Sequence, residues 1–323
     1  MRQLQEFYHS LGPEEPVVLV APEEHRARLQ AELEAASWRV DEVFGRLLWA
    51  RSPKVVPAQP LVWAIDCWRR PQRIRWKDDG ELSDLVRSSL KLGSVQDSTK
   101  DPCRWLDCST RRFENSQSVL KLLKSIPIAS ERMKWAQIRA DEGVLAAQSL
   151  WPWGFLRGAP RLRPKAAPSD AISKLLEAFE MVGAPQKGDR VIDLGASPGS
   201  WTYAALSSGA RVFACDRSPL ASQSWPVALT QRLQFRSGNA FAWDFSEHKP
   251  DWILSDLICT PEKLWGSLEK WIQDHPTARF VCTLKFKGDE GLDWIPRFSQ
   301  VPGAAVIHLQ NNQNEVCFLK MPE

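Results

Sequence analysis

A glycine-rich turn is the part of the sequence whose residue types point most directly to chemistry. It runs Val191-Ile-Asp-Leu-Gly-Ala-Ser-Pro-Gly-Ser-Trp201, a short apolar segment followed by two glycines and the start of a helical pattern. In an open α/β sheet, ligands bind at the carboxyl ends of the strands. Gly195 and Gly199 permit unusual backbone angles, and the start of the next helix offers free N–H groups to an anion. We therefore predict a site for a ligand that carries a carboxylate or a phosphate.

Two positions further along the chain favour an adenosine-containing cofactor. Asp216 ends the next apolar segment, 21 residues after Gly195, where a carboxylate can accept hydrogen bonds from a ribose diol. Asn239 and Ala240 follow the third apolar segment, where an amide side chain and a backbone N–H could bind the adenine edge. The dinucleotide NAD is a weaker alternative, because Pro198 interrupts the turn and the pattern Gly-x-Gly-x-x-Gly is absent. An ordinary turn without a ligand is the other alternative.

The elements around this turn predict a Rossmann-like α/β domain over residues 169–323. Apolar segments alternate with helical patterns, which indicates a mostly parallel sheet. The last two strand-like segments are joined by the short polar segment 310–314, which suits an antiparallel hairpin at the sheet edge. The expected helix is 170–182, and the expected strands are 190–194, 211–215, 233–236, 252–255, 279–284, 304–309 and 315–319.

The first half of the chain, residues 1–150, is predicted to form a separate α+β domain. Its elements follow the order β-α-β-β-α-β, which is typical of a ferredoxin-like fold. The basic, Pro- and Gly-rich segment 151–168 is the expected linker. Residues 116–150 are expected to be mainly helical. The other expected elements are strands at 17–21, 38–50, 61–68 and 104–110 and helices at 23–36 and 81–92.

Positive charge is concentrated in the first half. Residues 1–165 contain 27 Lys and Arg against 21 Asp and Glu, a net charge of +6, and the rest of the chain has a net charge of −3. Such asymmetry fits a basic accessory domain that meets a polyanion. Segment 68–77 interleaves five cations with two tryptophans, which suits phosphate contacts and base stacking, and Arg104, Trp105, Arg111 and Arg112 form a second cluster. The alternative is a strand whose arginine stems cover tryptophan faces. The predicted RNA-binding residues are Arg69, Arg70, Arg73, Arg75 and Lys77.

The composition argues against several other classes of protein. No apolar segment approaches the roughly 18 residues of a membrane span, and residues 1–10 lack the layout of a secretory signal. The 7 cysteines include no Cys-x-x-Cys pair, and the 5 histidines include no pair at metal-ligand spacing. We therefore expect a cytoplasmic protein with reduced thiols, no membrane contact and no metal. The sequence does not indicate an oligomeric state.

The motifs of the second half resemble those of the FtsJ-type RNA 2′-O-ribose methyltransferases. Within that family they are closest to the RlmM type, which modifies a cytidine of large-subunit ribosomal RNA. The resemblance implies that the cofactor is S-adenosylmethionine. It also implies that the partner is RNA, above all large-subunit ribosomal RNA, and that the first half contains a THUMP-like region. Ser197 and Ser200 depart from the Cys and Gly that relatives often have. The motifs are Trp151-Pro-Trp-Gly, Ala167-Pro-Ser-x-Ala-x-Ser-Lys-Leu-x-Glu-Ala-Phe179, Asp193-Leu-Gly-Ala-Ser-Pro-Gly-Ser-Trp-Thr-Tyr203, Ser255-Asp-Leu257, Thr283-Leu-Lys285 and Asn314-Glu-Val316.

The resemblance also implies a catalytic tetrad of Lys174, Asp256, Lys285 and Glu315. A ribose hydroxyl must lose its proton as it attacks a sulfonium methyl group, and Lys285 is the expected proton acceptor. Lys174 would favour proton loss from Lys285 as a nearby cation, while the two carboxylates orient the lysines. The residues expected to contact the cofactor are Asp193, Gly195, Ala196, Ser197, Pro198, Gly199, Ser200, Trp201, Asp216, Asn239, Ala240 and Asp256.

The residues after the fourth expected strand indicate which chemical group accepts the methyl group. Methyltransferases of exocyclic amines commonly carry a motif resembling Asn/Asp-Pro-Pro-Tyr there, whereas this chain has Asp256-Leu-Ile-Cys259. Methylation of a cytosine carbon would need a thiolate, but Cys259 and Cys282 lie in apolar segments. We therefore expect ribose methylation of RNA. The alternatives are a methyltransferase of a small molecule or protein and an inactive RNA-binding module.

Overall fold

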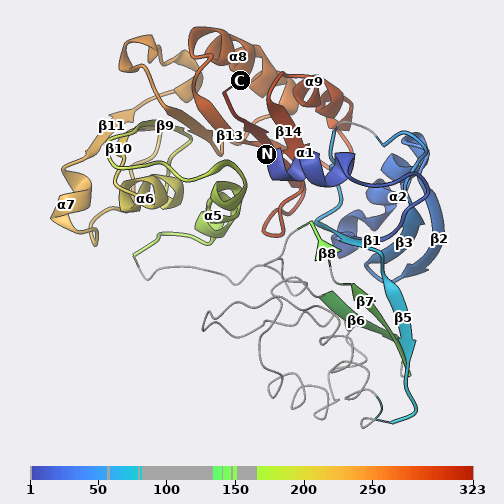
Figure 1. Cartoon of the computed structure of the whole chain (residues 1–323). Coiled ribbons are helices and arrows are strands. Elements are labelled where there is room, and N and C mark those ends of the chain that lie inside the picture. Colours follow the sequence, from blue (N-terminus) through green and yellow to red (C-terminus); the bar gives the residue numbers. More distant parts are fainter. Residues whose placement is uncertain are drawn as a thin grey trace. The chain divides into compact units, whose positions relative to one another are not determined.

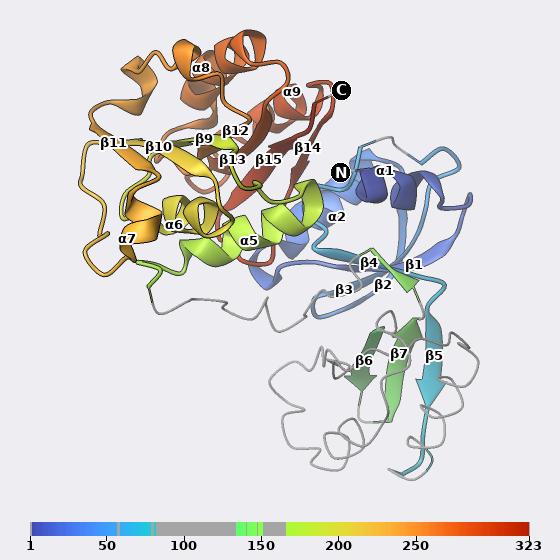
Figure 2. The ribbon, with the colours of Figure 1, turned by 60° about the vertical axis from the view of Figure 1, so that its left-hand side comes forward.

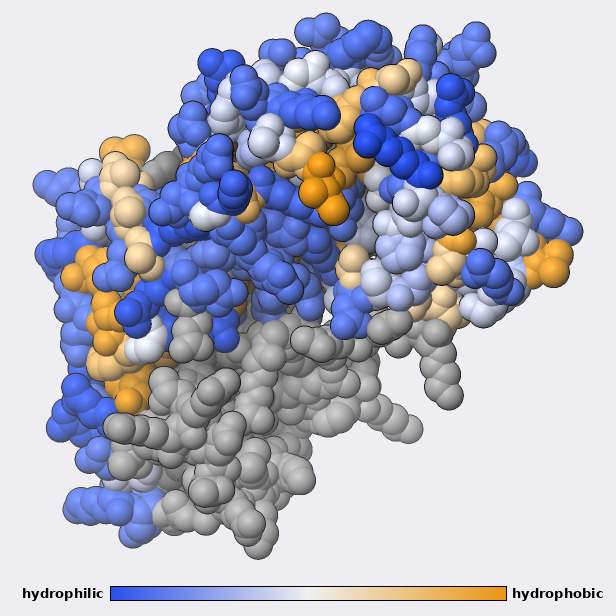
Figure 3. Space-filling model, turned by 180° about the vertical axis from the view of Figure 1, so that it is seen from behind, coloured by the Kyte–Doolittle hydropathy of each residue, from blue (hydrophilic) through white to orange (hydrophobic). Residues whose placement is uncertain are grey.

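The computed structural model describes residues 2–56, 59–78, 81, 134–139, 141–146, 148–150 and 166–322. The chain divides into two compact units, which are Phe7–Ala159 and a second unit formed by Met1–Glu6 with Pro160–Glu323. Figure 1 labels the elements of both, beginning with α1 (Arg2–His9). Most of the surface seen in Figure 3 is hydrophilic, and its apolar residues form small separate groups. Within the described residues, every helix is too short or too polar to cross a bilayer.

A seven-stranded sheet forms the centre of the C-terminal unit. Its strands follow the order β11-β10-β9-β12-β13-β15-β14. The first five in this order pair in parallel, while β15 pairs antiparallel with both β13 and β14. The prediction of a mostly parallel sheet that ends in an antiparallel hairpin is confirmed. The strands are β9 (Arg190–Leu194), β10 (Arg211–Asp216), β11 (Leu233–Ser237), β12 (Trp252–Ser255), β13 (Arg279–Lys285), β14 (Ala304–Ile307) and β15 (Glu315–Lys320).

Helices cover both faces of this sheet, with α5 and α6 on one face and α8 on the other (Figure 2). Strands β12, β13, β14 and β15 are almost entirely buried, which explains their apolar sequences, whereas the edge strand β11 is mostly exposed. Thr260 caps the first turn of α8 by accepting a hydrogen bond from the Lys263 amide. The helices are α5 (Ala171–Val182), α6 (Ser200–Ser207), α7 (Val227–Thr230), α8 (Pro261–Asp274) and α9 (Ile295–Ser299), with 3₁₀ turns η2 (Ala240–Ala242), η3 (Ser246–His248) and η4 (Leu292–Trp294).

The order of the strands fixes where a ligand can bind. From the central strand β9 the chain proceeds outward to β10 and β11, then returns to the other side of β9 as β12 and β13. The connections on the two sides therefore diverge at the carboxyl ends of β9 and β12. A crevice at such a switch point is the usual ligand site of an open α/β sheet.

The N-terminal unit contains two antiparallel sheets. The larger has the order β2-β3-β1-β4-β8 and packs around apolar residues that include Val18, Leu47, Ile65 and Trp68, and the smaller has the order β5-β7-β6. The larger sheet consists of β1 (Pro16–Val20), β2 (Arg39–Phe44), β3 (Leu47–Arg51), β4 (Asp66–Arg69) and β8 (Gln148–Ser149), with η1 (Glu23–His25) and α2 (Arg26–Ala35) between β1 and β2. The smaller consists of β5 (Gln72–Arg75), β6 (Lys134–Arg139) and β7 (Glu142–Ala146).

Two predictions for this half were wrong. Segment 38–50 is a hairpin of two strands and not one strand, because the chain turns at Gly45, which has φ +55°. The segment expected to be mainly helical forms strands β6, β7 and β8 at its end. Apart from Glu81, the expected helix 81–92 lies outside the described residues, as do strand 104–110, the second basic cluster and the Trp151-Pro-Trp-Gly motif. The expected strand 61–68 begins only at Asp66, and four strands, β2 to β5, follow α2 in the described part of this half, so the expected order β-α-β-β-α-β is not observed there.

Candidate active site

The turn after β9 requires both of its glycines. Gly195 has φ +78° and Gly199 has φ +115°, angles that side chains with a Cβ rarely adopt. A Cβ on Gly195 would lie 3.0 Å from the Leu257 side chain, and one on Gly199 would lie 2.9 Å from the Trp225 ring. The two positions thus combine a special backbone angle with a close approach of neighbouring groups.

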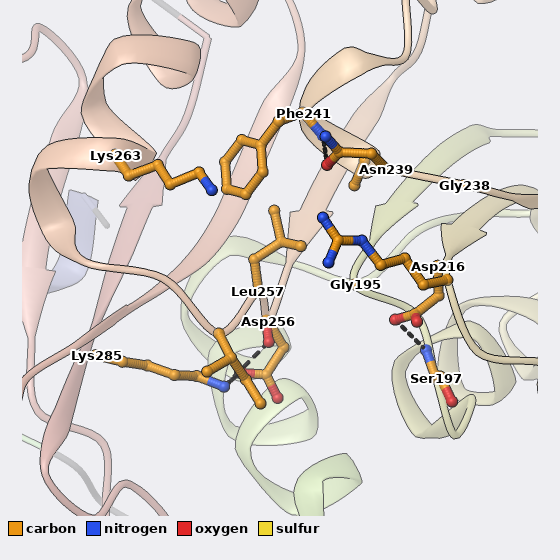
Figure 4. A pocket seen from close by; sticks show the side chains of 13 residues that line it. Gly195, Ser197, Asp216, Gly238, Asn239, Phe241, Asp256, Leu257, Lys263 and Lys285 are labelled. Atoms are coloured by element: carbon orange, nitrogen blue, oxygen red, sulfur yellow. Dashed lines mark hydrogen bonds and ion pairs between the residues drawn. The ribbon is translucent and has the colours of Figure 1, made fainter.

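Asp216 at the end of β10 holds this turn in place. Its Oδ2 accepts a hydrogen bond from the Ser197 amide at 3.1 Å, and its Oδ1 accepts one from the Ser218 amide at 2.8 Å. The Ser197 hydroxyl donates to the Pro219 carbonyl at 3.0 Å. Figure 4 shows the contact between the Asp216 carboxylate and Ser197 at the rim of a cavity.

That cavity, the cofactor-side cavity, has a volume of about 370 Å³ and lies at the carboxyl ends of β9, β10 and β12. Seven residues predicted from the sequence line it: Gly195, Ser197, Asp216, Asn239, Ala240, Asp256 and Lys285. The prediction missed others, among them Phe241, Leu257 and Lys263, and Lys263 Nζ lies 4.6 Å from the Phe241 ring centroid (Figure 4). The position of segment 257–263 directly after β12 could have indicated Leu257 and Lys263, because the central strands end at this crevice.

Six predicted cofactor residues are missing from the described lining: Asp193, Ala196, Pro198, Gly199, Ser200 and Trp201. Two of them fasten α6 to the segment around the start of α5. The Trp201 indole donates to the Ala171 carbonyl at 2.9 Å, and the Ser200 hydroxyl donates to the Ser169 carbonyl at 3.1 Å. Asp193 is fully buried and accepts a hydrogen bond from Thr202 at 2.5 Å. Burial raises the pKa of Asp193 to about 7, against the opposing effect of that hydrogen bond.

The four residues of the predicted tetrad lie together at this edge of the sheet. Lys174 Nζ is 2.5 Å from Glu315 Oε1 and 3.5 Å from Asp256 Oδ1. Lys285 Nζ is 2.9 Å from the same Asp256 Oδ1 and donates to the Asp256 carbonyl at 3.0 Å (Figure 4). The β13–β15 register places Lys285 directly opposite Glu315. The Thr283 hydroxyl also donates to Asp256 Oδ1, at 2.7 Å.

The Asp256 carboxylate therefore lies between two ammonium groups. Burial alone would raise the pKa of Asp256, but Lys174 and Lys285 outweigh it and lower that pKa. Burial alone would lower the pKa of Lys174, but Asp256 and Glu315 outweigh it and raise that pKa. The Lys174 side chain is 8% exposed and that of Lys285 is 26% exposed, so Lys285 is the lysine that a substrate can reach.

Neither cysteine near the site has the environment of a nucleophile. Burial raises the pKa of Cys282 far above its usual range and also raises the pKa of Cys259. Both thiols are thus protonated at neutral pH, and a thiolate mechanism has no support in these surroundings.

Comparison with known proteins agrees with the motifs. Residues 168–291 match the family model of the FtsJ-like methyltransferases. This part of the chain is similar to the FtsJ-like methyltransferases. The chain is 34% identical over 146 residues to the ribosomal RNA large subunit methyltransferase M of Thauera aminoaromatica, which covers 42% of this chain and 38% of that protein. It is 33% identical over 157 residues to the protein of that name from Pseudomonas putida, with 46% and 42% covered.

The chain spans about 40% of the length of these curated relatives. Among solved structures it is similar to a putative ribosomal RNA methyltransferase of Plasmodium falciparum, with a TM-score of 0.36, 15% identity, and 48% and 97% of the two chains covered. It is also similar to an RNA methyltransferase of Salinibacter ruber solved with S-adenosylhomocysteine, with a TM-score of 0.33, 19% identity, and 50% and 95% covered. The resemblance inferred from the sequence motifs is confirmed by the family model.

Glu177 lies one turn after Lys174 and binds the loop that precedes Glu315. Its carboxylate accepts hydrogen bonds from the Gln310 amide at 2.8 Å and from the Asn311 amide and side chain at 3.3 and 3.1 Å. Burial raises the pKa of Glu177 to about 7, although these donors oppose the shift. Glu177 is not among the predicted site residues, yet its spacing of three residues from Lys174 places both on one face of α5.

The loop is fastened on its other side as well. The Asn312 side chain donates to the Glu315 carbonyl at 3.0 Å, and the Asn314 side chain donates to the Phe286 carbonyl at 2.9 Å. The segments that carry Lys174, Lys285 and Glu315 are therefore joined by buried or half-buried hydrogen bonds.

The predicted RNA-binding arginines of the N-terminal unit differ in their surroundings. Arg69 is 12% exposed and donates to Glu15 at 2.7 and 2.8 Å, and Arg73 pairs with Glu42 and lies over the Trp49 ring at 4.9 Å. Arg70 and Arg75 are 74% and 72% exposed and lie 3.6 Å from Glu15 and Glu142, respectively. The backbone amide of Lys77 donates to Glu81 at 2.8 Å.

Both tryptophans of segment 68–77 are buried. Trp68 is 0% exposed and Trp76 is 7% exposed. Neither ring is available to stack on a base. The structure therefore favours the second interpretation of this segment, in which arginine side chains cover aromatic rings. Arg70 and Arg75 retain the exposure that a phosphate contact needs.

Proposed function

We propose that this protein transfers a methyl group from S-adenosylmethionine to a ribose 2′-hydroxyl of RNA, with large-subunit ribosomal RNA as the substrate. The observation that carries the proposal is the shared position of Asp256 between Lys174 and Lys285, beside the cavity at the glycine turn. A carboxylate and an accessible lysine suit the removal of a hydroxyl proton. The curated relatives bear the name ribosomal RNA large subunit methyltransferase M, and their RNA substrate class is the basis for the RNA named here.

The residues of the cofactor-side cavity fit S-adenosylmethionine. A Cβ on Gly195 would fill space beside Leu257, and the turn brings its backbone to the cavity wall. Each oxygen of Asp216 accepts one backbone hydrogen bond and keeps a lone pair that a ribose hydroxyl can use. Asn239 and Ala240 are the candidates for the adenine edge. When bound, S-adenosylmethionine supplies a methyl group on a positively charged sulfur.

Each member of the tetrad has a distinct proposed role. Lys285 accepts, at Nζ, the proton that the ribose hydroxyl loses. Asp256 orients that nitrogen through its carboxylate and its carbonyl, with Thr283 fixing the carboxylate. Lys174 stays charged, because two carboxylates raise its pKa, and holds Asp256 and Glu315 in place. Positioning of the hydroxyl supplies the rest of the acceleration.

The first half of the chain, residues 1–150, is proposed to bind the RNA, and residues 151–168 to link it to the methyltransferase domain. The proposed RNA binding is supported by the net charge of +6 over residues 1–165 and by the exposure of Arg70 and Arg75. The cytoplasm is the proposed location, because ribosomal RNA is the proposed substrate.

The variant Lys285→Ala tests the proposed chemistry. With labelled S-adenosylmethionine and total RNA, wild-type protein is expected to label RNA, and the variant to lose about 10²- to 10⁴-fold in rate, the usual effect of removing a general base. Calorimetry is expected to show that the variant still binds the cofactor. Lys270→Ala, which removes an exposed lysine paired only with Asp274 among the described ion pairs, is the control and should keep wild-type activity. Retained turnover by Lys285→Ala would remove Lys285 from its role.

A further inference from the structure

A second cavity adjoins the cofactor-side cavity, and its lining includes Lys285 but not Gly195. It has a volume of about 640 Å³ and is formed by segment 258–262 and segment 285–294. Ile258 and Lys285 line both cavities. The Ile258 side chain is 92% exposed. The two cavities therefore meet at the lysine that is proposed to accept the proton.

We call this second cavity the acceptor-side cavity. Its walls are held in place by contacts within the same unit of the chain. Gly291 has φ +91°, and a Cβ there would lie 3.1 Å from Pro261, so segment 285–294 packs closely against the start of α8. Lys287 and Glu290 form a β-bridge that closes a tight turn. The Asn314 side chain donates to the carbonyls of Phe286 and Gly288 at 2.9 and 3.3 Å. The cavity is thus a built feature of the fold.

Its lining includes the Trp294 ring and the cations Lys285 and Lys287, together with three carboxylates: Glu262, Glu290 and Asp293. Trp294 is half-buried, and the Arg297 guanidinium lies 4.8 Å from its ring centroid. Lys287 is exposed at the same cavity. An accessible indole and a lysine at the rim suit a nucleotide, because bases stack on aromatic rings and lysines contact phosphates.

We infer that the acceptor-side cavity receives the acceptor nucleotide of single-stranded RNA, with its base against Trp294 and a neighbouring phosphate at Lys287. The inference rests on the proposed function. In a methyl transfer the nucleophile approaches the methyl carbon from the side opposite to the leaving sulfur, so donor and acceptor occupy opposite sides of the transfer point. A base within a duplex is stacked and paired and cannot enter such a cavity, so the nucleotide must be unpaired.

Trp294→Ala tests the stacking. Loss of a stacked base is worth about 1–3 kcal/mol, so we expect the variant to bind a labelled pool of short random-sequence single-stranded RNA about 5- to 150-fold more weakly than wild type. Trp294→Phe is expected to restore most of the binding. Cofactor affinity should not change, since Trp294 lies outside the lining of the other cavity. Phe235→Ala, at another exposed aromatic residue of the same unit, is the control and should bind RNA normally.

Lys287→Ala tests the phosphate contact. We expect the slope of log binding constant against log salt concentration to fall by about 0.7, the contribution of one phosphate on a single strand. Arg211→Ala removes a cation at the amino end of β10, away from both cavities, and should leave the slope unchanged.

The outcomes separate this inference from the proposed function. If wild-type protein methylates RNA but Trp294→Ala binds and methylates RNA as wild type does, the cavity assignment is overturned and the function stands. If RNA binding depends on Trp294 while wild-type protein labels no RNA, the contact between single-stranded RNA and Trp294 stands, and both the function and the role of the bound nucleotide as acceptor are overturned. A Trp294→Ala variant that also loses cofactor affinity would indicate a general structural role and would overturn the assignment.

Discussion

At the scale of single residues, the charge states of three side chains determine how the rate should depend on pH. Lys285 must be neutral to accept a proton, whereas Asp256 and Lys174 must stay charged. Two lysines lower the pKa of Asp256, and two carboxylates raise the pKa of Lys174. Neither of these two groups therefore changes charge near neutral pH.

We expect the single-turnover transfer rate to depend on pH through the loss of one proton, because the ribose hydroxyl loses one proton in the transfer while Asp256 and Lys174 keep their charge. Rates measured with saturating cofactor and RNA across the neutral and mildly alkaline range check this. A rise that requires the loss of two protons would contradict the assignment of Lys285 as the single proton acceptor.

The sequence predicted which residues lie at the site better than it predicted what each of them contacts. Lys174, Asp256, Lys285 and Glu315 were grouped by the resemblance of the motifs to those of a known family, and the structure brings the four side chains together. Ser200 and Trp201 were expected at the cofactor but bond to residues around the start of α5. The side-chain direction on the first turn of a helix depends on packing that a motif does not encode.

At the scale of elements, Glu177 connects α5 to the loop between β14 and β15. Glu177→Gln would keep one oxygen acceptor but turn an N–H₂ group toward the N–H donors of Gln310 and Asn311. We expect a loss of about 1–3 kcal/mol in the free energy of unfolding and a lower transfer rate with unchanged cofactor affinity. Glu180→Gln, at an exposed position on the same helix, is the control and should affect neither. Normal stability and rate in Glu177→Gln would refute this role.

The same residue gives a stability difference that depends on pH. Burial raises the pKa of Glu177 from 4.5 to about 7, so the folded state binds this proton more readily than the unfolded state between those values. The contribution of Glu177 to the free energy of unfolding of the wild-type protein therefore falls as the pH rises from 4.5 to about 7. The Gln variant has no titrating group at this position and lacks the effect. Urea unfolding should show a larger deficit of the variant at about pH 5 than at about pH 8.

The elements of the second half could be predicted closely, because buried parallel strands are continuous apolar segments separated by helical patterns. The errors lie in the first half. In segment 38–50, apolar residues continue to both sides of the turn at Gly45, which hides the hairpin. In β6 and β7, residues such as Ala136, Gln137 and Glu142 favour helices, but pairing between the strands outweighs this local preference.

At the scale of the whole molecule, binding of RNA should involve both halves of the chain. We expect the double variant Arg70→Ala/Arg75→Ala to bind RNA more weakly and to lower the salt slope by about 1.4, the contribution of two phosphate contacts. The double variant Arg39→Ala/Arg51→Ala removes two arginines that pair with Asp41 in the same unit and serves as the control. Filter binding at several salt concentrations measures both. Equal slopes in all three proteins would contradict an RNA contact at Arg70 and Arg75.

The position of the transferred methyl group on RNA tests the central claim most directly. Alkaline cleavage of RNA needs a free 2′-hydroxyl next to the phosphate, so a 2′-O-methyl group protects the linkage that follows it. RNA labelled by the wild-type protein from S-adenosylmethionine should therefore yield the label in alkali-stable dinucleotides and, after enzymatic digestion, in a 2′-O-methyl nucleoside. Label recovered in mononucleotides or on a methylated base would contradict the account.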